Sequence, residues 1–260
     1  MATSPSVLEA GTVQQSIVDG IATVTFGHPK SNSLPGALLR QLADVVRDLG
    51  ETGEARVVVL RSEGTGPFCA GASFDELRAI RDEATGKEFF MGFARLILAM
   101  RSIPKLVIAR VQGKAVGGGV GIAAAADYTL ATHSASVKLS ELAVGIGPFV
   151  VGPAIQRKIG TGAFAALAID AANWRDAGWA ERHGLYASVH DDVESLDAAT
   201  DALARTLARS NPEAMARMKR IFWKGTEEWD VLLAERAETS GTLVLSEFTR
   251  AAIESVGRRG

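Results

Sequence analysis

The sequence is poor in the residues that carry redox, metal and covalent chemistry. Among its 260 residues there is one cysteine, Cys69, and there are four histidines. A single cysteine cannot form a disulfide within the chain, and a chain of this length buries enough apolar surface to fold without one. The histidines show no spacing typical of metal ligands. We therefore expect a reducing compartment, the cytoplasm, and no metal site.

Long apolar runs and an excess of charge of one sign are missing as well. No uninterrupted apolar stretch approaches the roughly 20 residues that span a bilayer, and residues 1–6 lack the basic start and apolar core of a secretory signal. Lys and Arg number 28 against 30 Asp and Glu, for a net charge of −2, so no overall field attracts a polyanion. We expect neither a membrane nor a nucleic-acid partner.

The apolar periodicity predicts an α/β fold. Residues 13–17 and 21–26 flank Asp19-Gly20, a pair typical of a tight hairpin turn. Residues 57–60 and 106–108 are short apolar runs typical of parallel strands that are covered on both faces. Between them, apolar residues at helical spacing predict a crossover helix whose aromatic side chains belong to the core.

Further helices are expected before and after this strand pattern. Apolar residues recur at helical spacing over 38–49, with Ser33 as the capping residue. From residue 193 onward strand signals disappear and helical ones remain. We expect two parts, an α/β core over 1–192 and a helical region over 193–260 that packs on the core or on a neighbouring subunit.

Two glycine-marked turns, residues 68–74 and 113–121, follow the two parallel strands. The loops after the strands of an open α/β sheet converge at one edge, where ligands bind. Ser73 and Glu76 have the spacing of a capping box that opens a helix, and the second turn runs into a small-residue helix with unpaired N–H groups. The turns can aim two backbone donors at one point, as in an oxyanion hole. They can equally be tight turns without a ligand.

A dinucleotide site is the competing interpretation of the second turn. Residues 119–124 match the pattern G-x-G-x-x-A, and Glu141 lies twenty residues after Gly121. Against it, the match lies deep in the chain, after a strand and a helix, and leaves the 68–74 turn without a role.

Glu141 is the best candidate for acid–base chemistry. It lies in a largely apolar segment, residues 138–148, and such surroundings raise a carboxyl pKa toward neutrality. A capping role fits the composition equally well. No G-x-S-x-G elbow is present, and Cys69 is expected to be a small buried side chain, so covalent catalysis is not expected.

These features together resemble the crotonase, or enoyl-CoA hydratase/isomerase, superfamily over nearly the whole chain. The resemblance is carried by the hairpin, the turn at 68–72, the Gly117-Gly118-Gly119 turn and the Leu139-Ser140-Glu141 segment, in that order and spacing. It implies a spiral core of ββα turns and a helical C-terminal region that builds homotrimers or hexamers. It also implies an acyl-CoA thioester substrate, with no cofactor besides the CoA that the substrate carries.

The resemblance further implies roles for single residues. The oxyanion donors fall on the amides of Ala70 and Gly118, and Glu141 is the acid–base residue. Phe149, just past Gly147-Pro148, is expected either to shape the acyl pocket or to belong to the core. The residues expected to contact CoA or the acyl group are Ala70, Gly71, Ala72, Ser73, Gly117, Gly118 and Phe149, with Ser73 in place of the family's usual acidic residue.

The glycine at position 121 affects which reaction is expected, hydration or isomerisation. Hydratases of this family hold water with two glutamates; the second matches Glu141, whereas the first falls on Gly121. Glu141 alone also suits an isomerase, which moves one proton between carbons of a bound enolate. Residues 139–149, 111–114 and 246–248 look most like bacterial methylglutaconyl-CoA hydratases. We therefore expect an enoyl-CoA hydratase, with the isomerase, a dinucleotide-dependent oxidoreductase and a non-catalytic CoA-binding protein as alternatives.

Overall fold

A hairpin starts the main sheet. In the computed structural model, which describes residues 11–257, β1 (Thr12–Val18) pairs antiparallel with β2 (Ile21–Gly27). Asp19 and Gly20 take positive φ angles of 51° and 80°, as a tight two-residue turn requires, so the predicted hairpin is confirmed. Residues 1–6, on which the expectation about a secretory signal depends, lie outside the described residues.

Parallel strands build the rest of this sheet, in the order β1-β2-β3-β4-β6-β8. In β3, Val58 and Leu60 belong to the large core on one face, whereas Val57 and Val59 belong to a smaller cluster on the other. Both faces are buried, which is why these strands are continuous apolar runs in the sequence. The parallel strands are β3 (Val57–Ser62), β4 (Leu106–Val111), β6 (Tyr128–Thr132) and β8 (Ser188–His190).

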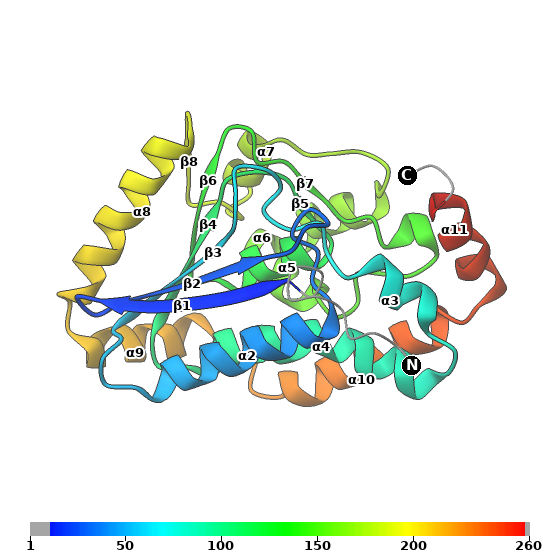
Figure 1. Cartoon of the computed structure of the whole chain (residues 1–260), viewed down its shortest axis with the longest axis horizontal. Helices are drawn as coiled ribbons and strands as arrows, with labels where there is room; N and C mark the ends of the chain where they lie inside the picture. Colours follow the sequence, from blue (N-terminus) through cyan, green and yellow to red (C-terminus); the bar gives the residue numbers. More distant parts are fainter. Residues whose placement is uncertain (1–10, 258–260) are drawn as a thin grey trace.

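Helices cover both faces of the sheet. Figure 1 shows α8 (Val193–Ala208) along one side and α2 (Gly36–Glu51) with α4 (Glu83–Ser102) below it. Buried Arg110 of β4 fixes α8 by donating to both carboxylate oxygens of Asp197, at 2.7 and 3.1 Å. The other helices are α3 (Phe74–Ala79), α5 (Gly118–Ala125), η1 (Leu142–Val144), α6 (Gly152–Ile169), α7 (Ala177–Arg182), α9 (Pro212–Phe222), α10 (Trp229–Leu243) and α11 (Glu247–Gly257).

A second, smaller set of short strands gives the fold its spiral character. After its long strand, each turn of the chain adds a short segment to this set and then a helix. The mixed α/β fold with ββα turns is therefore confirmed. The short set consists of the parallel pair β5 (Ala115–Val116) and β7 (Val137–Lys138) and the single bridges Leu34 to Ala72, Cys69 to Ala115 and Val137 to Arg175.

The start of α2 differs from expectation. Ser33 does not cap the helix, because its hydroxyl lies 3.2 Å from Nδ1 of His28. The Gly36 amide instead donates to Oε2 of Glu76 at 2.7 Å, which places a carboxylate at the positive end of the helix. Glu76 is thus unavailable to complete a capping box with Ser73, whose hydroxyl accepts only from the Glu76 amide, at 3.3 Å.

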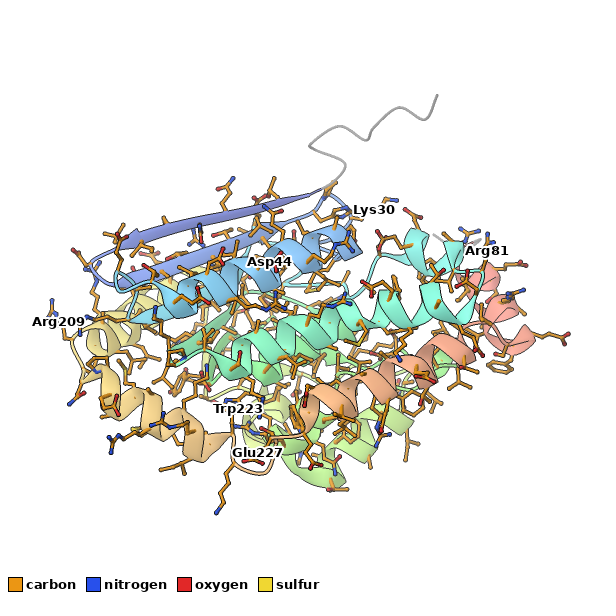
Figure 2. The ribbon with its side chains drawn as sticks, turned by 90° about the horizontal axis from the view of Figure 1, so that it is seen from below. Lys30, Asp44, Arg81, Arg209, Trp223 and Glu227 are labelled. Atoms are coloured by element: carbon orange, nitrogen blue, oxygen red, sulfur yellow. The ribbon has the colours of Figure 1, made fainter. Side chains whose placement is uncertain are left out.

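The helices after residue 192 pack closely on the rest of the chain. Figure 2 shows α2, α4 and α10 side by side, with α4 in the middle. The helices α4 and α10 meet at Gly86 and Gly241, where a Cβ on Gly86 would lie 2.8 Å from the Cα of Gly241. None of the helices within residues 11–257 is long and apolar enough to cross a membrane.

The glycine contact between α4 and α10 predicts that alanine at this crossing lowers the stability of the chain, although alanine in a helix usually raises it. Replacing a helical glycine by alanine ordinarily stabilises a protein by up to about 1 kcal/mol. Gly86→Ala should instead destabilise the chain by roughly 1–3 kcal/mol, because the new methyl group overpacks the crossing. Gly162→Ala in α6 is the control, since nothing lies within 4 Å of its Cβ position. Urea unfolding measures both, and equal stabilities would contradict the close crossing.

Candidate active site

A pocket of about 150 Å³ lies where the two glycine turns meet the segment after β7. Both turns contribute to its wall, as do the Glu141 segment and helices α3 and α4. The expectation that the aromatic residues of α4 belong to the core is only partly right, because Phe89 and Phe90 are half-buried and border this pocket. The five phenylalanines that line it are Phe74, Phe89, Phe90, Phe93 and Phe149.

Backbone hydrogen bonds hold the two turns together. The amide of Val116 donates to the carbonyl of Cys69 at 2.9 Å, and the amide of Cys69 donates to the carbonyl of Lys114 at 3.2 Å. Gly71 has a φ of 91°, and a Cβ there would lie 3.1 Å from the Val116 carbonyl oxygen. Only glycine combines this backbone angle with so close an approach, so the turns meet at Gly71.

The Gly118 amide is free to bind a ligand. Gly118 is the first residue of α5 and lines the pocket, and the first N–H groups of a helix have no partner within the helix. Among residues 11–257 its amide has no hydrogen-bond acceptor. The preceding residue, Gly117, has a φ of 52°, and its own amide donates to the carbonyl of Lys138 at 2.9 Å.

The Ala70 amide is not free, and the expectation that it is an oxyanion donor is wrong. It donates to the carbonyl of Ser31 at 3.1 Å. The neighbouring free amide is that of Ala72. The bridge to Leu34 uses the Gly71 carbonyl and the Ser73 amide, so the Ala72 N–H points the other way. Ala72 lines the pocket, and its amide has no acceptor in the described part of the chain.

Glu141 presents its carboxyl group beside the second turn. A Cβ on Gly117 would lie 2.9 Å from Oε1 of Glu141, and Oε2 is inaccessible to solvent, with no partner among the described residues. Burial raises the pKa of Glu141 from 4.5 to about 7, as the apolar segment predicted. Glu141 is the only ionisable side chain that lines the pocket within residues 11–257.

The loop after Glu141 is held by α11. The amide of Ile146 donates to the Glu141 carbonyl at 2.9 Å, which closes the loop. The Thr249 hydroxyl donates to the carbonyl of Gly145 at 3.1 Å, and the ring of Phe248 lies against the same glycine. Ile253 of α11 packs with Ile146 and with other apolar residues of the pocket wall. The helix α11 therefore supports the loop that forms one side of the pocket.

Three other predicted residues lie apart from the reacting groups. Ser73 caps α3 and does not line the pocket, so its contact with CoA stays a prediction. Cys69 is fully buried, and burial raises the pKa of its thiol to about 12, which leaves no thiolate for covalent chemistry. Gly121 faces Val151, and a Cβ on Gly121 would lie 2.5 Å from Cγ1 of that valine. There is no room for a larger side chain at Gly121.

The interpretation of residues 119–124 as a dinucleotide fingerprint is wrong. A dinucleotide site places its glycines in the turn before the helix, whereas Gly119 and Gly121 lie inside α5 and are buried. A side chain on Gly119 would meet the Cys69 carbonyl, and a side chain on Gly121 would meet Val151. Within the described residues, no three His, Cys, Asp or Glu side chains are grouped so that they could hold a metal ion.

Comparison with known proteins finds one family. The sequence model of the enoyl-CoA hydratase/isomerase family matches residues 16–252. A carnitinyl-CoA dehydratase of Escherichia coli K12 is 30% identical over 223 residues, which are 86% of this chain and 84% of that protein. A short-chain-enoyl-CoA hydratase of Clostridium acetobutylicum is 28% identical over 230 residues, 87% of each chain.

Solved structures agree in fold. An enoyl-CoA hydratase from Mycobacterium avium superposes with a TM-score of 0.84 at 28% identity, over 95% of this chain and 96% of that one. An enoyl-CoA hydratase from Bacillus halodurans gives a TM-score of 0.86 at 20% identity, over 94% of this chain and 99% of that one. At the lower identity the likeness concerns the fold alone.

The raised pKa of Glu141 predicts how stability depends on pH. The folded protein holds this proton up to about pH 7, whereas an unfolded glutamate loses it near 4.3. The stabilisation is therefore complete below the unfolded pKa and is lost as pH rises through the folded pKa. Relative to Glu141→Gln, the wild type should lose roughly 2–3 kcal/mol of unfolding free energy between pH 4.5 and pH 8. Urea unfolding of both proteins measures this, and parallel pH profiles would contradict the buried carboxyl.

Proposed function

Because the chain belongs to the enoyl-CoA hydratase/isomerase family, we propose that it adds or removes water at the α,β double bond of an enoyl-CoA thioester. One observation carries the proposal. Two unpaired amides, those of Ala72 and Gly118, come from separate turns and border the same pocket as a single buried carboxyl, Glu141. Backbone donors beside one acid–base group suit a reaction through an enolate.

In this mechanism the thioester oxygen accepts hydrogen bonds from Ala72 and Gly118. The Glu141 carboxylate takes a proton from water while the water oxygen bonds to Cβ, and the double-bond electrons move onto the thioester oxygen. Glu141 then returns the proton to Cα and the carbonyl reforms, so the enzyme ends as it began. Dehydration is the reverse. Each donor aimed at the developing oxyanion is worth about 3 kcal/mol in the transition state, and no cofactor besides the CoA of the substrate is needed.

The acyl group is the finer part of the proposal. A dry cavity of about 150 Å³ holds a benzene-sized molecule, so the pocket, of about the same volume, suits a short acyl group. The sequence resemblance favours methylglutaconyl-CoA, whose acyl group ends in a second carboxylate. No Lys, Arg or His side chain lines the pocket within residues 11–257. Crotonyl-CoA and methylglutaconyl-CoA are therefore the two substrates to compare.

Double-bond isomerisation is the second candidate, favoured by the single carboxyl. Val151 fills the space beside Gly121, so no second acid reaches the pocket from this position of α5. A lone carboxylate can remove a proton from Cα of a β,γ-enoyl thioester and return it to Cγ, which gives the α,β isomer, or catalyse the reverse. The same two amides would stabilise the intermediate dienolate.

We also propose that the protein forms homotrimers or hexamers in the cytoplasm. Apolar side chains of α9 are exposed, with exposed fractions of 71% for Ile221 and 47% for Phe222. An apolar patch of this kind is typical of a contact between subunits. The one cysteine fits a reducing compartment. Light scattering in solution measures the mass of the assembly.

Absorbance of the conjugated enoyl thioester separates the two candidate reactions. Hydration of crotonyl-CoA removes this absorbance, whereas isomerisation of but-3-enoyl-CoA creates it. We expect loss with crotonyl-CoA to be the faster process, and the same assay ranks methylglutaconyl-CoA against it. Gain with but-3-enoyl-CoA, together with inert crotonyl-CoA, would replace the hydratase by the isomerase. No change with any of the three would refute both.

Activity should depend on the ionised form of Glu141. We expect kcat/KM to rise with pH, with a midpoint near the raised pKa of about 7, because the carboxylate is the base in both directions. Glu141→Gln should lower kcat by roughly 10²-fold or more while acyl-CoA binding persists. Glu51→Gln, at the exposed end of α2, is the matched control and should leave kcat unchanged. A pH–rate profile that is flat from pH 5.5 to 8.5 would remove Glu141 from the mechanism.

A further inference from the structure

The ring of Phe93 lies directly against the backbone of Gly118. A Cβ on Gly118 would lie 2.1 Å from both Cε1 and Cζ of Phe93, so the ring occupies the direction in which a side chain would leave that residue. Phe93 is 5% exposed and borders the pocket. The edge of an aromatic ring therefore packs on the residue that carries one of the two free amides.

The peptide between Gly117 and Gly118 is held at its carbonyl but not at its N–H. The Gly117 carbonyl accepts from the amides of Val120 and Gly121 at 3.0 and 3.2 Å. Gly117 takes φ 52° and ψ −112°, a conformation that glycine reaches at little cost. The Gly118 N–H has no acceptor among the described residues that would fix its direction. The Gly117 amide is held by the Lys138 carbonyl at 2.9 Å, which restrains one side of the turn. Phe93 restrains the side that faces the pocket.

Phe93 is itself on a rigid element. Its helix, α4, is fixed near the C-terminal end by Lys219, whose Nζ donates to the carbonyl of Met100 at 2.6 Å. At Gly92, next to Phe93, a Cβ would lie 2.8 Å from Cδ1 of Leu39 on α2. The backbone of α4 thus touches α2 closely beside the ring, and the ring has little freedom to move away from Gly118.

From this packing we infer that Phe93 is the positioning residue of the Gly118 amide. The first turn of α5 holds the carbonyl of the Gly117–Gly118 peptide, and the ring holds the Gly118 end of this peptide in place on the pocket side and excludes water from one side of the N–H. A donor acts on a developing oxyanion only when its direction is set before the reaction. The inference rests on the proposed function, because it assigns Phe93 a role in the oxyanion hole.

The kinetic test compares two phenylalanines of the same helix. Phe93→Leu keeps an apolar side chain but removes the flat ring from Gly118, and it should lower kcat by roughly 10- to 100-fold with a small change in KM. Phe90→Leu is the matched control. Phe90 lines the same pocket, but the three atoms nearest to a Cβ on Gly118 all belong to Phe93. The control should change KM more than kcat. Equal effects of the two substitutions on kcat would overturn the role of Phe93.

A spectroscopic test measures the amide directly and needs no turnover. Hydrogen bonds to the thioester oxygen lower the infrared stretching frequency of its carbonyl, so bound butyryl-CoA labelled with ¹³C at this carbonyl should absorb at a lower frequency than the free ligand. We expect Phe93→Leu to lose part of this shift and Phe90→Leu to keep it. Thermal melting checks that both variants fold, and Phe93→Met replaces the leucine variant if that one does not.

The outcomes separate the two proposals. A full shift in folded Phe93→Leu would refute the positioning role while leaving the oxyanion hole in place. No shift in the bound wild type would refute the hole itself, and with it the role of Phe93. A reduced shift in Phe93→Leu, with a full shift in Phe90→Leu, supports both, whether or not the chosen enoyl-CoA is turned over.

Discussion

The site depends on the backbone ladder between the short strands. Ala72, Gly118 and Glu141 belong to three different turns of the spiral, and the hydrogen bonds from Val116 to Cys69 and from Gly117 to Lys138 fix those turns side by side. These bonds involve main-chain atoms only, so they place the donors whatever side chains surround them. A fold of this kind can keep one reaction centre while the pocket around it changes.

Low polarity has two opposite effects at this centre. The apolar wall withholds water from the Glu141 carboxyl, which brings its pKa to about 7, into the range where a group can both take and return a proton near neutral pH. The same dry surroundings strengthen the hydrogen bonds from the two amides to a charged oxygen. The folded state bears the cost, because above pH 7 it must bury an ionised carboxylate whose Oε2 has no hydrogen-bond partner among the described residues.

Local sequence signals predicted the elements well and the contacts between distant elements poorly. The Asp19-Gly20 turn, the buried strands and the raised pKa of Glu141 could be predicted because each depends on residues close by in the sequence. The cap of α2 could not, because Glu76 reaches it from 40 residues away. The same applies to Ala70 and Ala72, whose sequence context is nearly identical. Only the pairing of this turn with Leu34 and Ser31 decides which of the two amides is free.

The contact of α11 with the loop after Glu141 has a consequence for protein synthesis. Thr249 and Phe248 hold Gly145, and Ile253 packs against Ile146, which lines the pocket. A ribosome adds these residues after both glycine turns and Glu141 have been made. A nascent chain can therefore assemble the donors and the carboxyl early, whereas the loop after Glu141 gains its support only when α11 has left the exit tunnel and docked. Translation thus fixes this part of the pocket wall last, after the rest of the spiral is in place.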